Sequence, residues 1–287
     1  MSETTRRGFL KLAATGMSGA VASAAFALPA SASGSATGQG KHLQVWSCGG
    51  LAEAMLPAHQ EFTASTGVDI AYTGAFAAAL GKSLLASGST EVFAGRVLDL
   101  AKKLRAAGRM QYFVPLCFTS YVMVTPKGNP AGITTVQDMA RPGVRVAMAP
   151  EASPPGGQAV TGLLKKAALL EAVMGNVAHP GTCVQTAVTD VVDGKADVMI
   201  VELRVARLPE TAGKLDVFSI PDSLFPPGPL TFTLGLMQEA KDRALAETYM
   251  AFMTSDAGQA HFARSGFIPA KSDKGRELVE KLGVKDV

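Results

Sequence analysis

Several residue types and patterns that mark common classes of protein are scarce or missing in this sequence. Aromatic residues make up 6% of the 287 residues, which argues against a surface on which bases or sugars stack. The net charge is +3 and the basic residues are scattered along the chain, so we expect no nucleic-acid partner. The patterns Gly-x-Gly-x-x-Gly and Gly-x-Ser-x-Gly are both missing. Their absence removes the usual signatures of dinucleotide binding and of α/β-hydrolase chemistry.

The N-terminus has the features of a targeting segment. Residues 5–11, TRRGFLK, resemble a twin-arginine export signal, and an apolar, alanine-rich run follows from Leu12 to Leu28. Ala30-Ser31-Ala32 then matches a small-residue cleavage site. The run is too short and too rich in small residues for a membrane anchor, and no later stretch could span a bilayer. We therefore predict a signal peptide at 1–32, a flexible lead-in at 33–40 and a periplasmic mature protein.

Histidine and cysteine are also few. The four histidines form no His-x-x-x-His pair, which argues against a zinc enzyme. The three cysteines, Cys48, Cys117 and Cys183, form no Cys-x-x-Cys pair, which argues against a structural zinc site or a thioredoxin-type motif. In an exported protein an odd count leaves two explanations open: one disulfide plus a free thiol, or thiols with a function of their own.

What the chain does contain is an alternation of strand-like and helix-like segments, which predicts an α/β fold. The stretch 43–74 opens it with a strand, a small-residue loop Ser47-Cys48-Gly49-Gly50, a helix that Gly67 ends, and a second strand. A loop of this kind directs free backbone N–H groups and the positive end of a helix dipole at a ligand. The opening unit therefore predicts an anion site.

Further along, the pattern predicts a second lobe. A strand at 91–93 precedes a turn at Ala94-Gly95-Arg96, helices are expected at 77–86 and 158–173, and a long apolar strand at 114–124 crosses between lobes. A proline-rich link at 225–229 marks the return crossing. We predict lobe 1 at 41–120 plus 228–287 and lobe 2 at 121–227, with a hinge at the two crossings.

Four pieces of the chain, in this order and spacing, resemble type II periplasmic substrate-binding proteins, and among them the molybdate-binding family of ABC importers. They are 43–67, 121–130 (YVMVTPKGNP), 133–151 (ITTVQDMARPGVRVAMAPE) and 193–201 (DGKADVMIV), and the segment 255–270 resembles the family's closing helix. The resemblance implies two α/β lobes around one small ligand. It also implies delivery to a membrane permease, a monomer, and no catalysis.

The family's ligand loops fall on short segments of this chain. Together with the cysteines and a nearby arginine they make up the predicted site: Ser47, Cys48, Gly49, Gly50, Ala75, Phe76, Arg96, Cys117, Ser153, Cys183, Val184 and Glu202. Where the family commonly has a tyrosine, this chain has Glu202. Its carboxylate would disfavour a dianion unless it is protonated or paired, and Arg204 or Arg96 could supply the pairing.

Thiols replace the hydroxyls that this family usually has in its first loops. Cys48, Cys117 and Cys183 could hold a thiophilic metal or metalloid, since thiolates favour soft ions. They could equally be packing residues of tight loops, or two of them a disulfide. We therefore expect a solute-binding protein of an ABC importer, for a molybdate- or tungstate-like oxyanion or a soft ion. An exported thiol- or metal-dependent redox protein is the alternative.

Overall fold

The computed structural model describes residues 41–152, 156–225 and 231–286, all of which belong to the compact unit Gly40–Val287. The predicted signal peptide, the lead-in and most of the proline-rich link lie outside the described residues. Within the described ranges, no helix is both long enough and apolar enough to cross a membrane.

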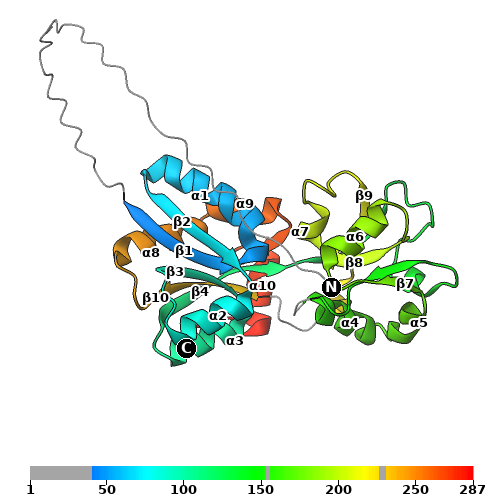
Figure 1. Ribbon diagram of the computed structural model, residues 1–287, viewed down its shortest axis with the longest axis horizontal. Coiled ribbons are helices and arrows are strands. Elements are labelled where there is room, and N and C mark those ends of the chain that lie inside the picture. The colour runs from blue at the N-terminus through cyan, green and yellow to red at the C-terminus, as the bar shows by residue number, and fades with distance from the viewer. Residues whose placement is uncertain (1–40, 153–155, 226–230, 287) are drawn as a thin grey trace, which may run out of the picture. The chain divides into compact units, whose positions relative to one another are not determined.

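A six-stranded mixed sheet organises lobe 1 (Figure 1). Its order is β11-β4-β10-β3-β1-β2, where β1 is His42–Cys48, β2 Asp69–Ala75, β3 Val92–Arg96, β4 Met110–Thr119, β10 Thr231–Met237 and β11 Phe267–Pro269. The central strand β1 is parallel to both β2 and β3, whereas β10 runs antiparallel between β3 and β4. The C-terminal part of the chain thus completes the sheet that the N-terminal part begins.

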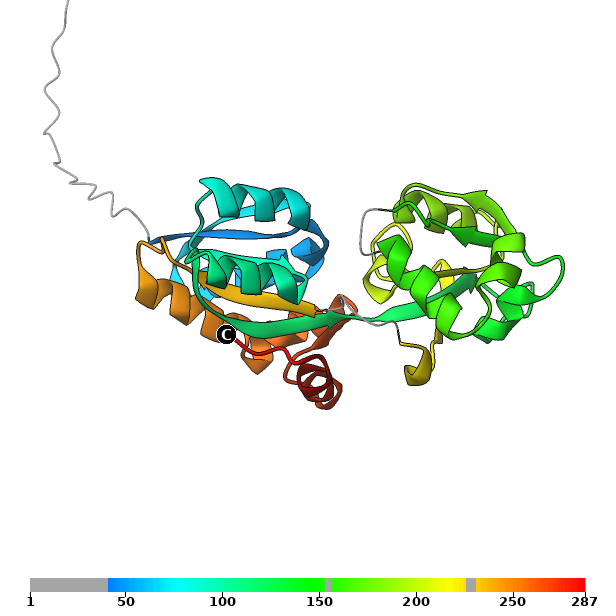
Figure 2. The same cartoon turned by 90° about the horizontal axis from the view of Figure 1, so that it is seen from below.

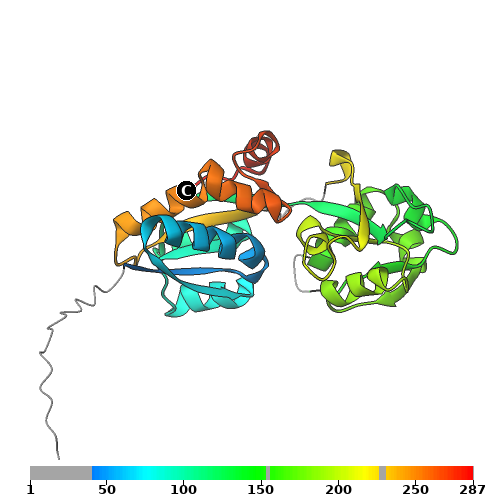
Figure 3. The same ribbon diagram turned by 90° about the horizontal axis from the view of Figure 1, so that it is seen from above.

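Helices cover both faces of this sheet (Figures 2 and 3). On one face lie α1 (Ala52–Thr66), α8 (Arg243–Met253) and α9 (Asp256–Arg264), packed around the fully buried Phe62 and Tyr249. On the other lie α2 (Ala77–Ala86) and α3 (Leu98–Ala106), packed around Leu84 and Leu104. The last helix, α10 (Asp273–Leu282), packs on the β4 edge of the sheet.

The predicted opening β-α-β unit is confirmed. β1 and β2 are parallel and in continuous register, with the short 3-10 turn η1 (Gly49–Leu51) leading into α1. Gly67 ends α1 with φ 71°, a left-handed conformation that glycine adopts without strain. The polypeptide between the two strands therefore places the loop 48–51 at the carboxyl end of the sheet.

Lobe 2 is a smaller α/β layer. Its strand β5 (Tyr121–Pro126) lies between β8 (Met199–Glu202) and β9 (Leu215–Ser219), and β6 (Val146–Met148) pairs in parallel with β7 (Val177–Pro180). A bridge from Val146 to Val198 links the two groups of strands. The surrounding helices are η2 (Val136–Ala140), α4 (Gly156–Lys166), α5 (Leu170–Gly175), α6 (Val184–Val192), α7 (Leu203–Ala206) and η3 (Asp222–Leu224).

Two local predictions are wrong. Ala94, Gly95 and Arg96 continue β3 instead of forming a turn, because they pair with β10 from the far end of the chain. The helix predicted at 158–173 is two helices, α4 and α5, with Ala168 in the left-handed region at φ 55° between them. This break returns Leu169 and the fully buried Val173 to the core of lobe 2.

The predicted crossing strand is also divided. β4 ends at Thr119 in one sheet and β5 begins at Tyr121 in the other, so only Ser120 separates the two lobes on this path (Figure 2). Such a short connection lets a small change in backbone dihedrals move one lobe against the other.

Candidate functional site

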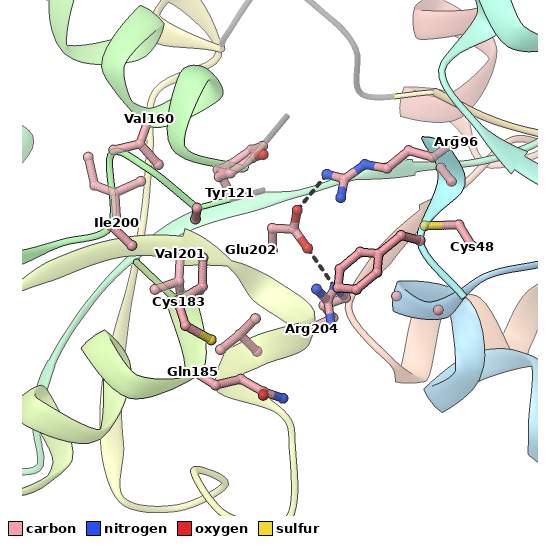
Figure 4. A pocket seen from close by; sticks show the side chains of 18 of the residues that line it. Cys48, Arg96, Tyr121, Val160, Cys183, Gln185, Ile200, Val201, Glu202 and Arg204 are labelled. Atoms are coloured by element: carbon pink, nitrogen blue, oxygen red, sulfur yellow. Dashed lines mark hydrogen bonds and ion pairs between the residues drawn. The ribbon is translucent and has the colours of Figure 1, made fainter. Parts of the chain in front are cut away.

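A cavity of about 670 Å³ lies where residues of both lobes meet (Figure 4). Five strands contribute their last residue to its lining: Cys48 of β1, Ala75 of β2, Arg96 of β3, Met148 of β6 and Glu202 of β8. Open α/β sheets bind ligands outside the carboxyl ends of their strands, where the following loops and helix starts are free to face a solute. The cavity occupies that position for both sheets at once.

An ion-pair network crosses the cavity from one lobe to the other. Nη2 of Arg96 donates to one oxygen of Glu202 over 2.5 Å, and Nε of Arg204 donates to the other oxygen over 2.5 Å (Figure 4). Nη1 of Arg204 also donates to Glu53 over 3.2 Å. The chain therefore pairs Glu202 with both arginines that were considered as its partners.

The network fixes the charge states of its members. Burial by itself would raise the pKa of Glu202, but the two guanidinium groups outweigh it and hold that pKa below its usual value. Although burial acts to lower the pKa of Arg96, the Glu202 carboxylate raises it above its ordinary value. Burial and the nearby Glu202 charge both raise the pKa of Tyr121. Glu202 is thus ionised and Tyr121 protonated at neutral pH.

Helix starts supply a second set of polar groups. η1 with α1, α2 and α6 all begin in the lining of the cavity, at Gly49, Ala77 and Val184. None of them has a side-chain cap that accepts a hydrogen bond from the first turn. The first N–H groups of a helix have no partner inside the helix, so the starts of η1 and α2 leave donors for an anion. At α6 the N–H groups of Gln185 and Thr186 also meet the Cys183 sulfur.

The cysteines occupy three different environments, and all three are free thiols. Cys48 is 7% exposed, and Cys183, which starts α6, is exposed; both line the cavity. The N–H groups of Thr186 and Gln185 lower the pKa of Cys183. Cys117 is fully buried, and burial raises its pKa well above the usual value. Its strand turns the thiol into the core of lobe 1, away from the cavity.

The three-cysteine metal site is therefore corrected. Within the described residues, no three His, Cys, Asp or Glu side chains lie close enough together to hold a metal ion. Ser47 is also absent from the described lining, because its hydroxyl is buried against Tyr72, 2.6 Å from the phenol oxygen. Ser153 lies outside the described residues. The other predicted site residues meet at the cavity: Cys48, Gly49, Gly50, Ala75, Phe76, Arg96, Cys183, Val184 and Glu202.

Sequence reasoning missed several polar members of the lining, among them Tyr121, Glu53 and Gln185. Tyr121 is 3% exposed and begins β5 immediately after the crossing. Glu53 lies in the first turn of α1, where a carboxylate also favours the helix dipole. A polar residue at a lobe crossing is the one signal that could have identified Tyr121.

With this geometry described, comparison with known proteins assigns the class. Residues 43–268 match the family model described as "Bacterial extracellular solute-binding protein", and the chain belongs to that family. The chain is 25% identical over 258 residues to the molybdate-binding protein ModA of Mycobacterium tuberculosis, an alignment that covers 83% of this chain and 89% of ModA.

Solved structures support the same fold at lower identity. The periplasmic molybdate-binding protein of Azotobacter vinelandii superposes with a TM-score of 0.63 at 16% identity, covering 79% of this chain and 98% of that one. The sulfate-binding protein SubI of M. tuberculosis gives a TM-score of 0.61 at 17% identity, covering 84% and 91%. These structures are two-lobe binding proteins, and the predicted type II fold is confirmed.

Proposed function

We propose that this protein is the solute-binding component of an ABC importer and that it captures a small anion in the cavity between lobes 1 and 2. The observation that carries the proposal is that two arginines and the starts of η1, α2 and α6 open onto the same cavity, none of these starts having a side-chain cap of standard geometry. Backbone donors at helix starts favour anions over cations. Molybdate or tungstate is the first solute to test, since molybdate stands in the names of relatives.

The family and the site both favour binding without turnover. The matched family consists of solute-binding proteins, and the described lining holds no pairing of a nucleophile with a general base. The remaining parts of the proposal come from the sequence: export by the twin-arginine route, a periplasmic location, a monomeric state, delivery to a membrane permease, and lobe boundaries at 120/121 and 227/228.

A soft metal or metalloid ion is the second candidate. The observation that favours it is that two thiols, Cys48 and Cys183, line one cavity and that the pKa of Cys183 is lowered. Thiolates at such a site would prefer soft ions to oxyanions. Only two thiols reach the cavity, however, and a third protein ligand would have to come from a neighbouring polar group.

A thermal-shift screen separates the candidates. The protein would be heated with molybdate, tungstate, sulfate, arsenite, or salts of copper, zinc and nickel, with and without reductant. A ligand that binds only the folded state raises the melting temperature by mass action. We expect an anion to stabilise the wild type and the Cys48→Ser and Cys183→Ser variants alike. A soft ion whose effect disappears in both variants would overturn the anion assignment in favour of the thiol site.

The role of the arginines is tested in the same assay. Arg96→Ala should weaken anion binding about 10- to 100-fold, because a charge-assisted hydrogen bond contributes about 1.5 to 3 kcal/mol. Ser272→Ala is the matched control, since Ser272 caps α10 outside the cavity lining. Failure of every anion to bind the wild type would refute the proposed function.

A further inference from the structure

The described charges of the cavity sum to zero. The charged side chains of its described lining are Arg96 and Arg204 against Glu53 and Glu202, and all four belong to the one ion-pair network. An inorganic dianion depends for its affinity on positive charge and hydrogen-bond donors. Here each guanidinium is already paired with a carboxylate, and the helix ends supply only partial charges. The site is therefore poorly matched to a compact dianion.

The walls of the cavity are apolar and come from both lobes. They include Phe76 of lobe 1 and Met148, Val160, Val184, Ile200 and Val205 of lobe 2 (Figure 4 labels Val160 and Ile200). Thr182 and Tyr121 are the hydroxyl-bearing members of the described lining. Pockets with mostly apolar walls and a few placed polar groups are typical of sites for organic molecules.

Phe76 is the most informative of these residues. Its side chain is 74% exposed although it is one of the large apolar residues of the chain, and it stands at the start of α2 in the cavity lining. A single exposed apolar residue is ordinary on a protein surface, but Phe76 shares the lining with the aliphatic side chains of lobe 2, so an apolar group bound there would contact both. At about 670 Å³ the cavity has room for roughly twenty waters at the volume each occupies in the liquid.

Three buried polar atoms of the lining make no hydrogen bond of standard geometry within the described residues: Nε of Arg96, the hydroxyl of Tyr121 and Oε2 of Glu53. Arg96 and Tyr121 are at most 9% exposed, and they are neighbours, since Arg96 acts on the pKa of the Tyr121 hydroxyl. Two donors on neighbouring side chains suit the oxygens of one acidic group, whereas the Glu53 oxygen can only accept a hydrogen bond. Arg96 and Tyr121 lie on the lobe-crossing side of the Glu202 network, across the cavity from Cys183 (Figure 4).

We infer that the solute is an organic anion, whose single acidic group meets Arg96 and Tyr121 and whose apolar body lies against Phe76 and the aliphatic wall of lobe 2. This inference rests on the proposed function and narrows it. In a cavity without net charge, a compact dianion gains little affinity from electrostatics. An organic anion gains affinity from burying its apolar body against the wall.

Matched pairs of anions test the inference by isothermal titration calorimetry. Each pair shares an acidic group and differs in the apolar body: acetate with phenylacetate, pyruvate with phenylpyruvate, and phosphate with phenyl phosphate. Molybdate, tungstate and sulfate complete the panel. We expect the phenyl member of at least one pair to bind tenfold or more tighter than its partner and than each inorganic oxyanion, since burying a phenyl group contributes about this much.

Variants of Phe76 test whether the affinity advantage of the phenyl anion comes from contact with this side chain. Phe76→Ala should reduce the ratio within the pair at least about fivefold, whereas Phe76→Leu keeps most of it because a large apolar side chain remains. Leu56→Ala is the matched control, since Leu56 is also an exposed apolar residue, 47% exposed, and does not line the cavity. Folding of each variant is checked by its melting temperature.

The possible outcomes separate this inference from the proposed function. If molybdate or another inorganic oxyanion binds tighter than every organic anion, the inference is wrong and the proposed function stands. If no anion of either class binds, both are wrong. If a phenyl anion binds best but Phe76→Ala leaves its advantage unchanged, the apolar body does not lie where we place it and the inference fails.

Discussion

The helices that begin at the cavity differ from four that begin elsewhere in the described chain. η2, α8, α9 and α10 each start with a side chain that accepts a hydrogen bond from the first turn, and these caps are Thr135, Asp242, Ser255 and Ser272. The helical runs that start in the cavity lining are η1 with α1, α2 and α6. They are preceded by Cys48, Phe76 and Cys183 and have no such bond of standard geometry.

The missing caps lower the stability of the helices that begin at the cavity and leave backbone donors there for a ligand. A side-chain cap stabilises a helix by about 0.5 to 2 kcal/mol, so three uncapped starts in one place forgo several kcal/mol unless a ligand meets their donors. α3, α5, α7 and η3 also start without a side-chain cap, so a missing cap alone does not mark a site. What marks the site is that several uncapped starts lie around the same cavity.

The largest expected effect tests the charged part of the cavity. Glu202→Ala leaves Arg96 and Arg204 without the carboxylate that both of them contact, and the Arg96 and Glu202 side chains are nearly buried. Removing one partner of a buried ion pair costs about 3 to 5 kcal/mol. We expect the free energy of unfolding in urea to fall by that amount, several times more than for removal of an outer cap.

Two further variants make this result interpretable. Glu202→Gln retains an oxygen that can accept from one arginine and should lose less stability than Glu202→Ala. Ser272→Ala should lose about 1 kcal/mol, as expected for a cap. A Glu202→Ala variant no less stable than Ser272→Ala would show that the network contributes little.

The pH dependence of stability tests the same carboxylate. Because the folded-state pKa of Glu202 lies below its ordinary value of 4.5, the unfolded chain binds more protons in that window and stability rises with pH there. The contribution is complete above about pH 5 and is lost as pH falls through the folded-state pKa.

The measurement is a set of urea titrations between pH 7 and pH 3 on wild type and Glu202→Gln. The difference between the two proteins isolates Glu202, since Asp138 and Asp197, whose pKa values are also lowered, are present in both. We expect this difference to shrink as the pH falls. A difference independent of pH would mean that the pKa of Glu202 is not lowered in the folded protein.

Local patterns predicted the parts of this fold whose interactions are local. The helix at 77–86 begins and ends where the sequence placed it, and Gly67 ends α1 as its conformational freedom suggests. The extension of β3 to Arg96 could not be seen locally, because its partner β10 lies more than a hundred residues away. Pairing between distant strands carries no short-range signal.

The candidate site also has features that could be predicted from local sequence and features that could not. The requirement that Glu202 be paired followed from its charge alone, and Arg96 and Arg204 satisfy it. The absence of Cys117 from the cavity lining did not follow, because strand alternation assigns a side chain to a face only once the register is known. Tyr121 was missed because it lies in an apolar strand whose pattern predicts core packing alone.

The contrast between capped and uncapped helix starts can be tested by introducing a cap at the cavity. Phe76 precedes α2 with φ −62° and ψ 130°, the extended conformation that N-cap residues adopt. Phe76→Asp should stabilise the protein by about 0.5 to 1 kcal/mol, because aspartate caps the first turn and favours the helix dipole. It should also weaken anion binding at least tenfold in calorimetry, since its carboxylate occupies the donors.

Phe76→Ala is the control for the lost phenyl group, since alanine neither caps the helix nor adds charge. Phe76→Asp and Ser272→Ala then change stability in opposite directions, and only Phe76→Asp affects the anion. Unchanged anion affinity in Phe76→Asp would mean that the start of α2 does not contribute to the site.

The smallest effect concerns the thiol that starts α6. Cys183 is exposed and its pKa is lowered, whereas Cys48 is nearly buried and burial raises the pKa of Cys117. Iodoacetamide should therefore label Cys183 first, as followed by mass spectrometry, while Cys183→Ser changes stability by less than about 0.5 kcal/mol. A saturating anion should slow this labelling because it occupies the same cavity. Equal labelling with and without the anion would place the anion away from α6 and leave the other two helix starts to account for its binding.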